Sequence, residues 1–418
     1  MLTLGNLSET MERIKQYIAF LGGPEAGGRL SGTESARKAA DYLAAFLQQT
    51  GYSPAGIDGY LTPVEVSAAR LTGPAQLTIG EKRLRHRIDF AEMAPFSSGG
   101  SVTGTLVTIR DGEEIDSDNL AGKVVLIPER PDRFDLKKTA EAAVVLGVAA
   151  LLIEFGDPHW FPKTIFGSKN NKIPVIRIRR SLAQEFADQE VQVHLELPLE
   201  TETMVCNNVY GFLPGAKTDR TLVLTAHYDH LGDDPGGVRF PGAIDNGSGV
   251  AVMMEVARSL KQNQRSLPFH VLVAFVTGEE SGLWGSRHLA ANPPVPLSAV
   301  INLDCLGFEP ILNAMRVGHK SPGLWLADLA AAVILDHGVE PKWIYGGEDS
   351  VAFTEKGIPA VGFGQKPTLS DSIAIHTPND NPENLHDKPI ELGLSIVSEL
   401  INRLAILESW EPEMERTG

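Results

Sequence analysis

From residue 208 onward, short apolar runs alternate with longer segments whose apolar residues recur at helical spacing. The apolar runs occupy residues 221–226, 269–276, 299–303 and 359–363, and the helical patterns occupy residues 249–260 and 390–407. Strands that are apolar throughout are typical of a sheet covered on both faces, and their alternation with helices is typical of parallel strands. We therefore predict an α/β fold in which helices flank a mixed, mostly parallel central sheet.

The chain before residue 208 has a different character. Ser31 and Glu34 have the spacing of a capping box, and the helical pattern that follows ends at Gly51. Between residues 59 and 130 the chain holds short β-rich runs and many glycines, followed by an Ala-rich helical pattern at about 136–145. A chain of 418 residues more often forms two or three domains than one, so we expect a second, β-rich α+β unit in this region.

The composition excludes several broad classes of protein. With 37 basic and 53 acidic residues the formal charge is −16, which argues against a broad nucleic-acid or anionic-membrane surface. No stretch approaches the roughly 20 apolar residues of a membrane-spanning helix. The first residues carry Glu9 and Glu12 without a basic segment followed by an apolar run. We therefore expect a cytoplasmic protein, or a secreted one if a leader precedes this sequence.

Polar residues follow the apolar runs at five places, and His227 with Asp229 forms the first of them. An imidazole at a strand end can bind a metal ion while a nearby carboxylate orients it. Taken alone, however, a His-x-Asp pair is more often an exposed histidine beside a solvated acid. The second place is Asp245, within a run of small residues from Gly242 to Gly249, where an ordinary helix cap is the alternative.

The other three places add carboxylates and a second imidazole. Glu279 and Glu280 follow the second apolar run, where one carboxylate could bind a cation while the other accepts a proton from water. Asp304 ends the third run and is either a cap or a ligand. His376 lies in a polar loop that also holds Asp380, which could orient the histidine or the loop. Each signal alone is weak.

Taken together, these places offer two imidazoles and three carboxylates near the strand ends of one sheet, with one glutamate to spare. Ligands in α/β sheets gather at the carboxyl ends of strands. Two zinc ions bring four positive charges, which Asp245, Glu280 and Asp304 would neutralise together with one hydroxide. Nitrogen and oxygen donors of this kind suit zinc, with cobalt or manganese as replacements in vitro. We therefore predict a site for two Zn²⁺ ions per chain.

Five motifs in this part of the chain resemble those of the M28 zinc peptidases. They are Ala226-His-Tyr-Asp-His-Leu-Gly232, Gly242-Ala-Ile-Asp-Asn-Gly-Ser-Gly249, Gly278-Glu-Glu-Ser-Gly-Leu-Trp-Gly-Ser286, Asn302-Leu-Asp304 and His376-Thr-Pro. They occur in the order of that family, and Gly28-Arg-Leu-Ser-Gly-Thr33 resembles the start of its members. The resemblance implies a zinc exopeptidase fold and a metallo-exopeptidase that hydrolyses a terminal peptide bond.

The resemblance also implies a role for each candidate residue. His227 and Asp304 would bind one zinc ion, and Glu280 and His376 would bind the other. Asp245 would bridge the two ions. Glu279 would then be the catalytic general base.

The chain departs from the family at two places near this site. Many relatives have tyrosine where this chain has Ile375, and Ser-Asp-His where it has Glu348-Asp-Ser350. Both changes concern substrate contacts rather than metal ligands. Cys305 follows a predicted ligand, but the alternation of side chains along a strand predicts that it points to the opposite face, into the core. With Cys206 as the only other cysteine, a disulfide scaffold is not expected.

The middle segment resembles a protease-associated domain. The similarity lies in Gly122-Lys-Val-Val-Leu126, Phe134, Lys137 and the segment 140–153. It implies that residues 67–203 are an insert in a discontinuous catalytic domain made of residues 1–66 and 204–418.

We favour aminopeptidase activity on peptides, because carboxylates beside the metal ions can hold the ammonium group of a substrate. The alternative, an enzyme like the glutamate carboxypeptidases, needs a cationic clamp that we cannot place among Arg239, Arg287 and Lys366. A catalytically silent, receptor-like protein would have lost ligands, and a glutaminyl cyclase normally uses one zinc ion. We expect a peptide as the partner, with no nucleic acid and no membrane, and the sequence indicates no oligomeric state.

Overall fold

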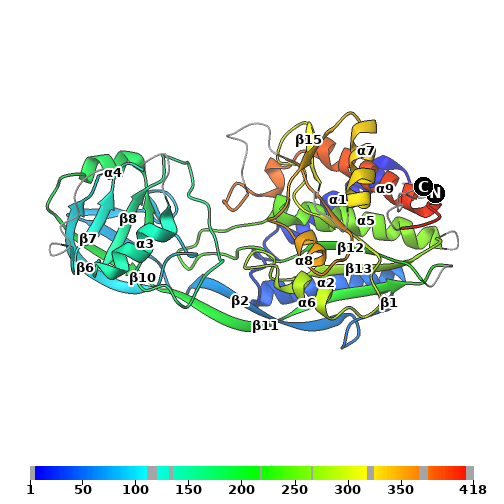
Figure 1. Cartoon of the computed structure of the whole chain (residues 1–418), viewed down its shortest axis with the longest axis horizontal. Coiled ribbons are helices and arrows are strands. Elements are labelled where there is room, and N and C mark those ends of the chain that lie inside the picture. Colours follow the sequence, from blue (N-terminus) through cyan, green and yellow to red (C-terminus); the bar gives the residue numbers. More distant parts are fainter. Residues whose placement is uncertain are drawn as a thin grey trace, which may run out of the picture.

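The computed structural model describes residues 5–110, 120–130, 135–216, 219–264, 267–317, 324–366 and 375–410. In Figure 1 a large, helix-rich body lies on the right and a smaller body on the left. Two long strands, β2 (Leu61–Leu71) and β11 (Leu199–Leu213), pair antiparallel and run from one body to the other. Among the helices that the structure describes, none is long and apolar enough to span a bilayer.

The large body is built on a mixed sheet of seven strands. Their order is β1-β11-β13-β12-β14-β17, with β2 added on β11. The strands from β13 to β17 in this order are parallel, whereas β1, β2 and β13 each pair antiparallel with β11. The further strands are β1 (Ser53–Pro54), β12 (Thr221–His227), β13 (His270–Val276), β14 (Ala299–Leu303) and β17 (Ala360–Phe363). The predicted mixed α/β fold is confirmed.

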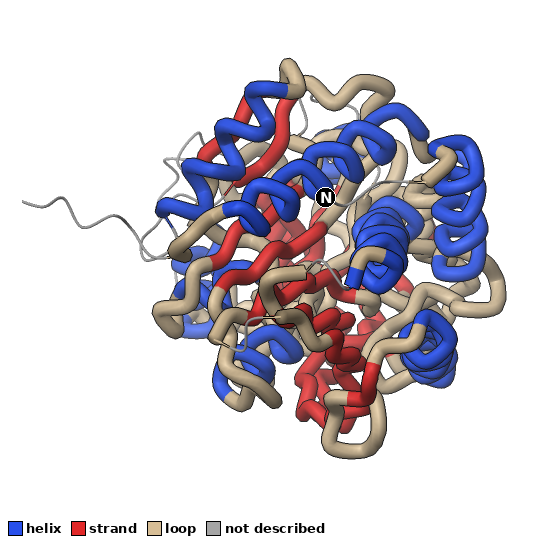
Figure 2. Tube along the Cα trace, turned by 90° about the vertical axis from the view of Figure 1, so that its right-hand side faces the viewer, coloured by secondary structure: helices blue, strands red, loops and turns tan. Residues whose placement is uncertain are grey.

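Helices cover both faces of this sheet, as the view along the molecule in Figure 2 shows. One core is formed with α1 (Leu7–Leu21), α2 (Glu34–Thr50), α5 (Gly249–Gln262), α7 (Leu324–Asp336) and α9 (Asp387–Ile406), and the other with α6 (Trp284–Ala291) and α8 (Ser350–Thr354). Leu222 and Leu224 of β12 pack in the first core, and Val223 packs in the second. Because both faces of the strand are buried, it is apolar throughout.

Helix α2 begins later than the capping box predicted. Its N-cap is Thr33, whose hydroxyl accepts a hydrogen bond from the N–H of Ala36. Gly32 adopts a φ of 82°, and this turn separates Ser31 from the helix. Ser31 is buried instead, with its hydroxyl 3.0 Å from the hydroxyl of Thr277. The predicted stop at Gly51 is confirmed, since this residue ends the helix in the left-handed conformation.

The small body is built on a separate sheet of eight strands, in the order β4-β3-β10-β6-β7-β8-β9-β5. The strands are β3 (Gln76–Ile79), β4 (Lys82–Leu84), β5 (Phe90–Glu92), β6 (Gly100–Thr108), β7 (Val124–Ile127), β8 (Ala150–Glu154), β9 (Val175–Ile178) and β10 (Gln192–Leu197), accompanied by α3 (Leu136–Val145) and α4 (Arg180–Phe186). This body has apolar clusters of its own. Its assignment as a protease-associated domain with borders at 67 and 203 stays a prediction, and Phe134 lies outside the described residues.

Candidate metal centre

The parallel strands bring the polar residues of the sequence motifs to one edge of the large sheet. His227 is the last residue of β12, and Asp304 follows β14 directly. Glu279 and Glu280 lie in the turn after β13. Because the three strands run in the same direction, their carboxyl ends meet.

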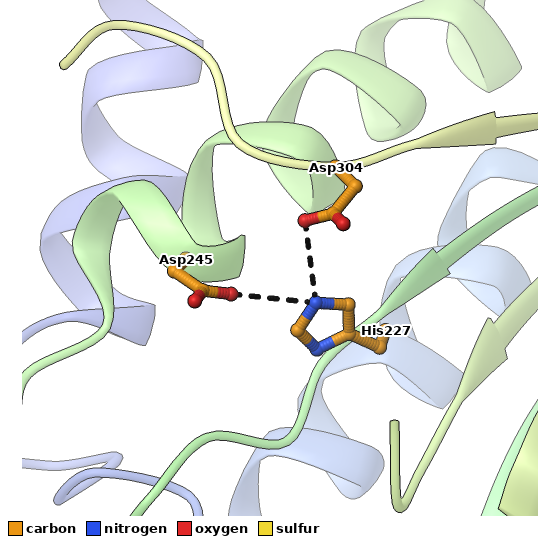
Figure 3. A group of neighbouring side chains, drawn as sticks. All are labelled: His227, Asp245 and Asp304. Carbon is orange, nitrogen blue, oxygen red and sulfur yellow. Dashed lines mark ion pairs between the residues drawn. The ribbon is translucent and has the colours of Figure 1, made fainter. Parts of the chain in front are cut away.

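Three of the predicted ligands form one compact group, drawn in Figure 3. The Nε2 atom of His227 lies 3.4 Å from Oδ1 of Asp245 and 3.4 Å from Oδ1 of Asp304. Asp245 projects from the turn Ala243–Ser248, which precedes α5. All three residues are buried, and their ligand atoms all lie within 4.8 Å of one another.

The same Asp245 also belongs to a second group. Its Oδ2 atom lies 3.1 Å from Nε2 of His376, which in turn lies 3.1 Å from Oε2 of Glu280. One carboxylate oxygen of Asp245 therefore faces His227, and the other faces His376. This is the arrangement that a ligand shared between two ions requires.

His230 enters the second group, although the sequence suggested no role for it. Its Nδ1 atom lies 2.6 Å from Oε1 of Glu280, and it offers a nitrogen within 4.8 Å of ligand atoms from Asp245 and Glu280. The ring is fully buried. Its place in the first motif, three residues after His227, was the signal that could have identified it.

Glu279 lies at the edge of the first group, with Oε2 3.9 Å from Nε2 of His227. Burial raises the pKa of Glu279 well above its usual range; the charge of His227 opposes this, and the carboxylates of Asp349 and Asp304 reinforce it. The main-chain N–H of Glu279 donates to Oδ1 of Asp229. Glu279 thus lies beside the cluster rather than at its centre.

Two further acids hold the site in place. The Nδ1 atom of His227 lies 3.2 Å from the main-chain oxygen of Asp229 and 3.7 Å from its Oδ1, so Asp229 supports both this ring and the Glu279 turn. Asp380, which we expected to orient His376 or its loop, accepts hydrogen bonds from the N–H groups of Ile244 and Asp245 at 2.6 and 3.1 Å, and its own N–H donates to the carbonyl oxygen of Thr377 in that loop. Burial raises the pKa of Asp380 to about 6.

Cys305 is buried in an apolar cluster with Ile244 and Phe308, as its predicted core position requires, but strand alternation is not what places it there. Its Sγ atom lies 3.0 Å from Oδ1 of Asp304, so it contacts the carboxylate that it follows in the sequence. The residue lies beyond the end of β14 and has a φ of 63°, and strand alternation therefore no longer applies to it. Cys305 and Cys206 are both buried and unbridged.

Three cations that the sequence analysis did not single out support the cluster. Arg29 is fully buried and donates to the carbonyl oxygens of Leu21, Tyr228, Pro241 and Gly242. Arg316, on the short strand β15 (Ala314–Val317), which pairs with β16 (Glu340–Trp343), has Nη2 3.3 Å from Oδ2 of Asp304. Lys163 belongs to the predicted insert and donates its main-chain N–H to the carbonyl oxygen of His376.

Comparison with known proteins finds a family model and relatives that match this part of the chain. The model of Peptidase family M28 matches residues 208–401. Aminopeptidase YwaD of Bacillus subtilis is 29% identical over 295 residues, covering 66% of this chain and 61% of the relative. The probable lipoprotein aminopeptidase LpqL of Mycobacterium tuberculosis is 26% identical over 324 residues, covering 75% of this chain and 60% of the relative. The match thus spans about 60% of the length of these two relatives.

Solved structures resemble the whole chain. The zinc aminopeptidase BSAP from Bacillus subtilis has a TM-score of 0.74 at 22% identity, covering 98% of this chain and 97% of its own. The aminopeptidase from Aneurinibacillus sp. strain AM-1 has a TM-score of 0.72 at 21% identity, covering 94% of each chain. At such identities the likeness concerns the fold. Residues 208–401 of this chain therefore match peptidase family M28, and the chain as a whole has the fold of these aminopeptidase structures.

Proposed function

We propose that this protein is a zinc-dependent aminopeptidase that releases N-terminal residues from peptides. The observation that carries the proposal is the position of Asp245 between His227 and His376, with one carboxylate oxygen directed at each ring. The names of the relatives support the same reading, because YwaD, LpqL and BSAP are each called an aminopeptidase.

The residues present fit two zinc ions. Donors that each lie about 2.0–2.1 Å from a tetrahedral ion are themselves about 3.3 Å apart. The distances of 3.4 Å around His227 and 3.1 Å around His376 agree with this spacing. In this proposal His227, Asp245 and Asp304 hold one ion, and Asp245, Glu280 and His376 hold the other.

When bound, such a metal pair polarises the scissile carbonyl and lowers the pKa of a water molecule. Glu279 accepts the proton of the attacking water and returns it to the leaving amine. Asp229 orients His227 and, through the N–H of Glu279, also the turn that carries the base. Asp380 holds Asp245 in position through two main-chain hydrogen bonds.

The charges around the cluster favour an amino-terminal substrate group over a carboxyl-terminal one. Glu279 and Glu280 are half-buried acids in the site and Asp349 is buried near them, and ionised carboxylates attract an ammonium group. Arg316 is the cation beside the first group, but its guanidinium already contacts the carboxylate and carbonyl of Asp304. Arg287 and Arg239 pair with Glu355 and Asp233 on the surface. No free clamp for a substrate carboxylate is therefore apparent among these arginines.

A catalytically silent binding protein is the second candidate. All five predicted ligands and the predicted base are present and gathered at one edge of the sheet, which argues against it. We also propose that residues 67–203 form an inserted domain of the protease-associated type, because the separate eight-stranded sheet lies within these borders.

The test compares zinc-loaded protein on leucyl-anilide and on N-acetyl-leucyl-anilide, with and without a chelator. We expect cleavage of the free-amine substrate alone, abolished by the chelator. Equal cleavage of the acetylated and the free-amine substrates would rule out recognition of the ammonium group. If neither anilide is cleaved, a peptide with C-terminal glutamate distinguishes a carboxypeptidase from a silent protein.

A further inference from the structure

A segment of the predicted insert, residues 161–167, lies directly against the candidate site. The N–H of Lys163 donates to the carbonyl oxygen of His376 at 2.8 Å. The buried Lys163 ammonium donates to the carbonyl of Gly232 at 3.0 Å and pairs with Asp234 at 2.8 Å. The carbonyl oxygen of Ile165 accepts from the N–H of Ala69 at 2.8 Å. The segment is thus held at both ends, so its side chains have fixed positions relative to the site.

Burial alternates along this segment. Phe161, Lys163 and Ile165 are buried, whereas the ring of Phe166 is 54% exposed. Phe166 projects beside the turn that carries the two glutamates: a Cβ atom built on Gly282 would lie 3.4 Å from Cε2 of its ring. A large apolar side chain is thus exposed where the insert meets the catalytic turn.

Trp284 also lies next to the Cβ position of this glycine. The Cβ position of Gly282 is 3.3 Å from Nε1 of Trp284, whose indole is 38% exposed. This indole N–H donates to the carbonyl oxygens of Ser67 and Ser281, which fixes the ring. Gly282 has no side chain to fill the space between the two aromatic rings. The pair therefore frames a small apolar surface next to the turn.

The position of this surface indicates which side of the scissile bond it would face in a bound peptide. The N–H of Gly282 donates to the carbonyl oxygen of Glu279 at 3.0 Å, so the surface and the proposed base share one turn. In the proposed reaction Glu279 gives its proton to the leaving amine. The peptide residue that carries this amine must therefore lie on the Glu279 side of the site.

We propose that Phe166 and Trp284 form an apolar subsite for the side chain of the residue that follows the scissile bond. The inference rests on the proposed peptidase function and deepens it. It makes Phe166 a specificity-determining residue that the insert contributes to the site. The subsite would select peptides whose second residue is aromatic or large and aliphatic.

The experiment measures kcat/KM of the zinc-loaded protein for Leu-Phe-amide and Leu-Gly-amide. Contact of a phenyl ring with an apolar subsite corresponds to a preference of about tenfold for Leu-Phe-amide. Phe166→Ala is expected to reduce this preference to about twofold, through a loss of kcat/KM that is much larger for Leu-Phe-amide than for Leu-Gly-amide, and Phe166→Leu is expected to retain most of the preference. Val145→Ala is the matched control, because Val145 is an 86% exposed apolar residue on α3 of the same insert.

The outcomes separate the inference from the function on which it rests. Any of three results would overturn the subsite: the wild type shows no preference, Phe166→Ala leaves the preference unchanged, or Phe166→Ala loses kcat/KM equally on both substrates. Failure of the wild type to hydrolyse either amide or leucyl-anilide would overturn the aminopeptidase proposal itself. A selective loss for Leu-Phe-amide in Phe166→Ala but not in Val145→Ala supports the subsite.

Discussion

The carboxylate of Asp380 accepts a hydrogen bond from the main-chain N–H of Asp245 at 3.1 Å, and a second from the N–H of Ile244 at 2.6 Å. Asp380 follows His376 by four residues. The loop that supplies one predicted ligand therefore also holds the turn that supplies the shared ligand. In the proposed two-zinc site, Asp380 would therefore couple the two metal positions.

Asp380→Asn should weaken zinc binding. The amide keeps one acceptor oxygen but loses the charge that strengthens both main-chain hydrogen bonds, so the Asp245 turn is held less firmly. Loss of a group that orients a ligand typically costs about 10–100-fold in metal affinity. Competition with a chromophoric chelator measures this affinity. Asp387→Asn is the control, because Asp387 forms an exposed ion pair with Lys15; equal affinities in the two variants would remove Asp380 from the metal centre.

Glu279→Gln should retain zinc and lose most turnover. The substitution keeps the shape of the side chain but removes its ability to carry a proton, and general acid–base catalysis contributes about 10²–10⁴-fold. Steady-state kinetics on leucyl-anilide, together with elemental analysis for zinc, measure both properties. Normal activity in a fully loaded variant would show that Glu279 is not the base.

Asp245→Ala should instead lose the metal itself. Both groups of predicted ligands include this carboxylate, so its removal leaves each with one donor fewer. We expect fewer than two zinc ions per chain and activity below that of the wild type by at least about 10²-fold. A variant that still holds two ions and is active would refute the shared ligand.

Arg29→Met should lower the free energy of unfolding by about 3–5 kcal/mol, because it leaves carbonyl oxygens buried without their donor. Burial lowers the pKa of Arg29 to about 10, with the charges of Asp380 and Asp229 opposing it, so the guanidinium stays protonated at neutral pH. Urea unfolding measures the change. Arg37→Met is the matched control: Arg37 forms exposed pairs with Glu34 and Asp41, and its loss should leave the free energy of unfolding nearly unchanged.

Acidification should destabilise the contact between the insert and the catalytic body. Arg87 is buried and lies 2.6 Å from Glu92 and 2.7 Å from Asp234. Burial is the largest single influence and would raise the pKa of both acids. The charge of Arg87, combined with His86 at Glu92 and with Lys163 at Asp234, outweighs burial and leaves each pKa lowered. The unfolded values are about 4.3 and 3.9, so this stability is present above about pH 4–5 and is lost as the pH falls towards the folded values.

The measurement for this cluster is urea unfolding at a series of pH values between about 6.5 and 3.5. Asp234→Asn should show a shallower loss of stability on acidification than the wild type, since one of the two acids no longer titrates. Asp233→Asn, a change at the neighbouring exposed acid that pairs with Arg239, should leave the slope unaltered. If the stability of Asp234→Asn falls with pH as steeply as that of the wild type, the assignment of this acid sensitivity to Asp234 is contradicted.

Much of the large body could be predicted from the sequence because its strands are buried on both faces. The runs at β12, β13, β14 and β17 are apolar throughout, and each ends close to where the sequence pattern ends. The start of α2 was misplaced because two hydroxyl residues, Ser31 and Thr33, compete for the cap. Only the turn at Gly32 decides between them.

The sequence by itself predicted the types and order of the candidate ligands, because His227, Glu280 and Asp304 follow apolar strands and parallel strands end at one edge of a sheet. Only the tertiary structure decided which oxygen of Asp245 faces which histidine, and that His230 joins the second group. It also decided the partners of Arg29, which lie up to 213 residues away in the chain, and the position of Phe166 beside Gly282. These contacts have no periodic signal, because they join distant segments through isolated side chains whose neighbours are set by packing of the whole chain.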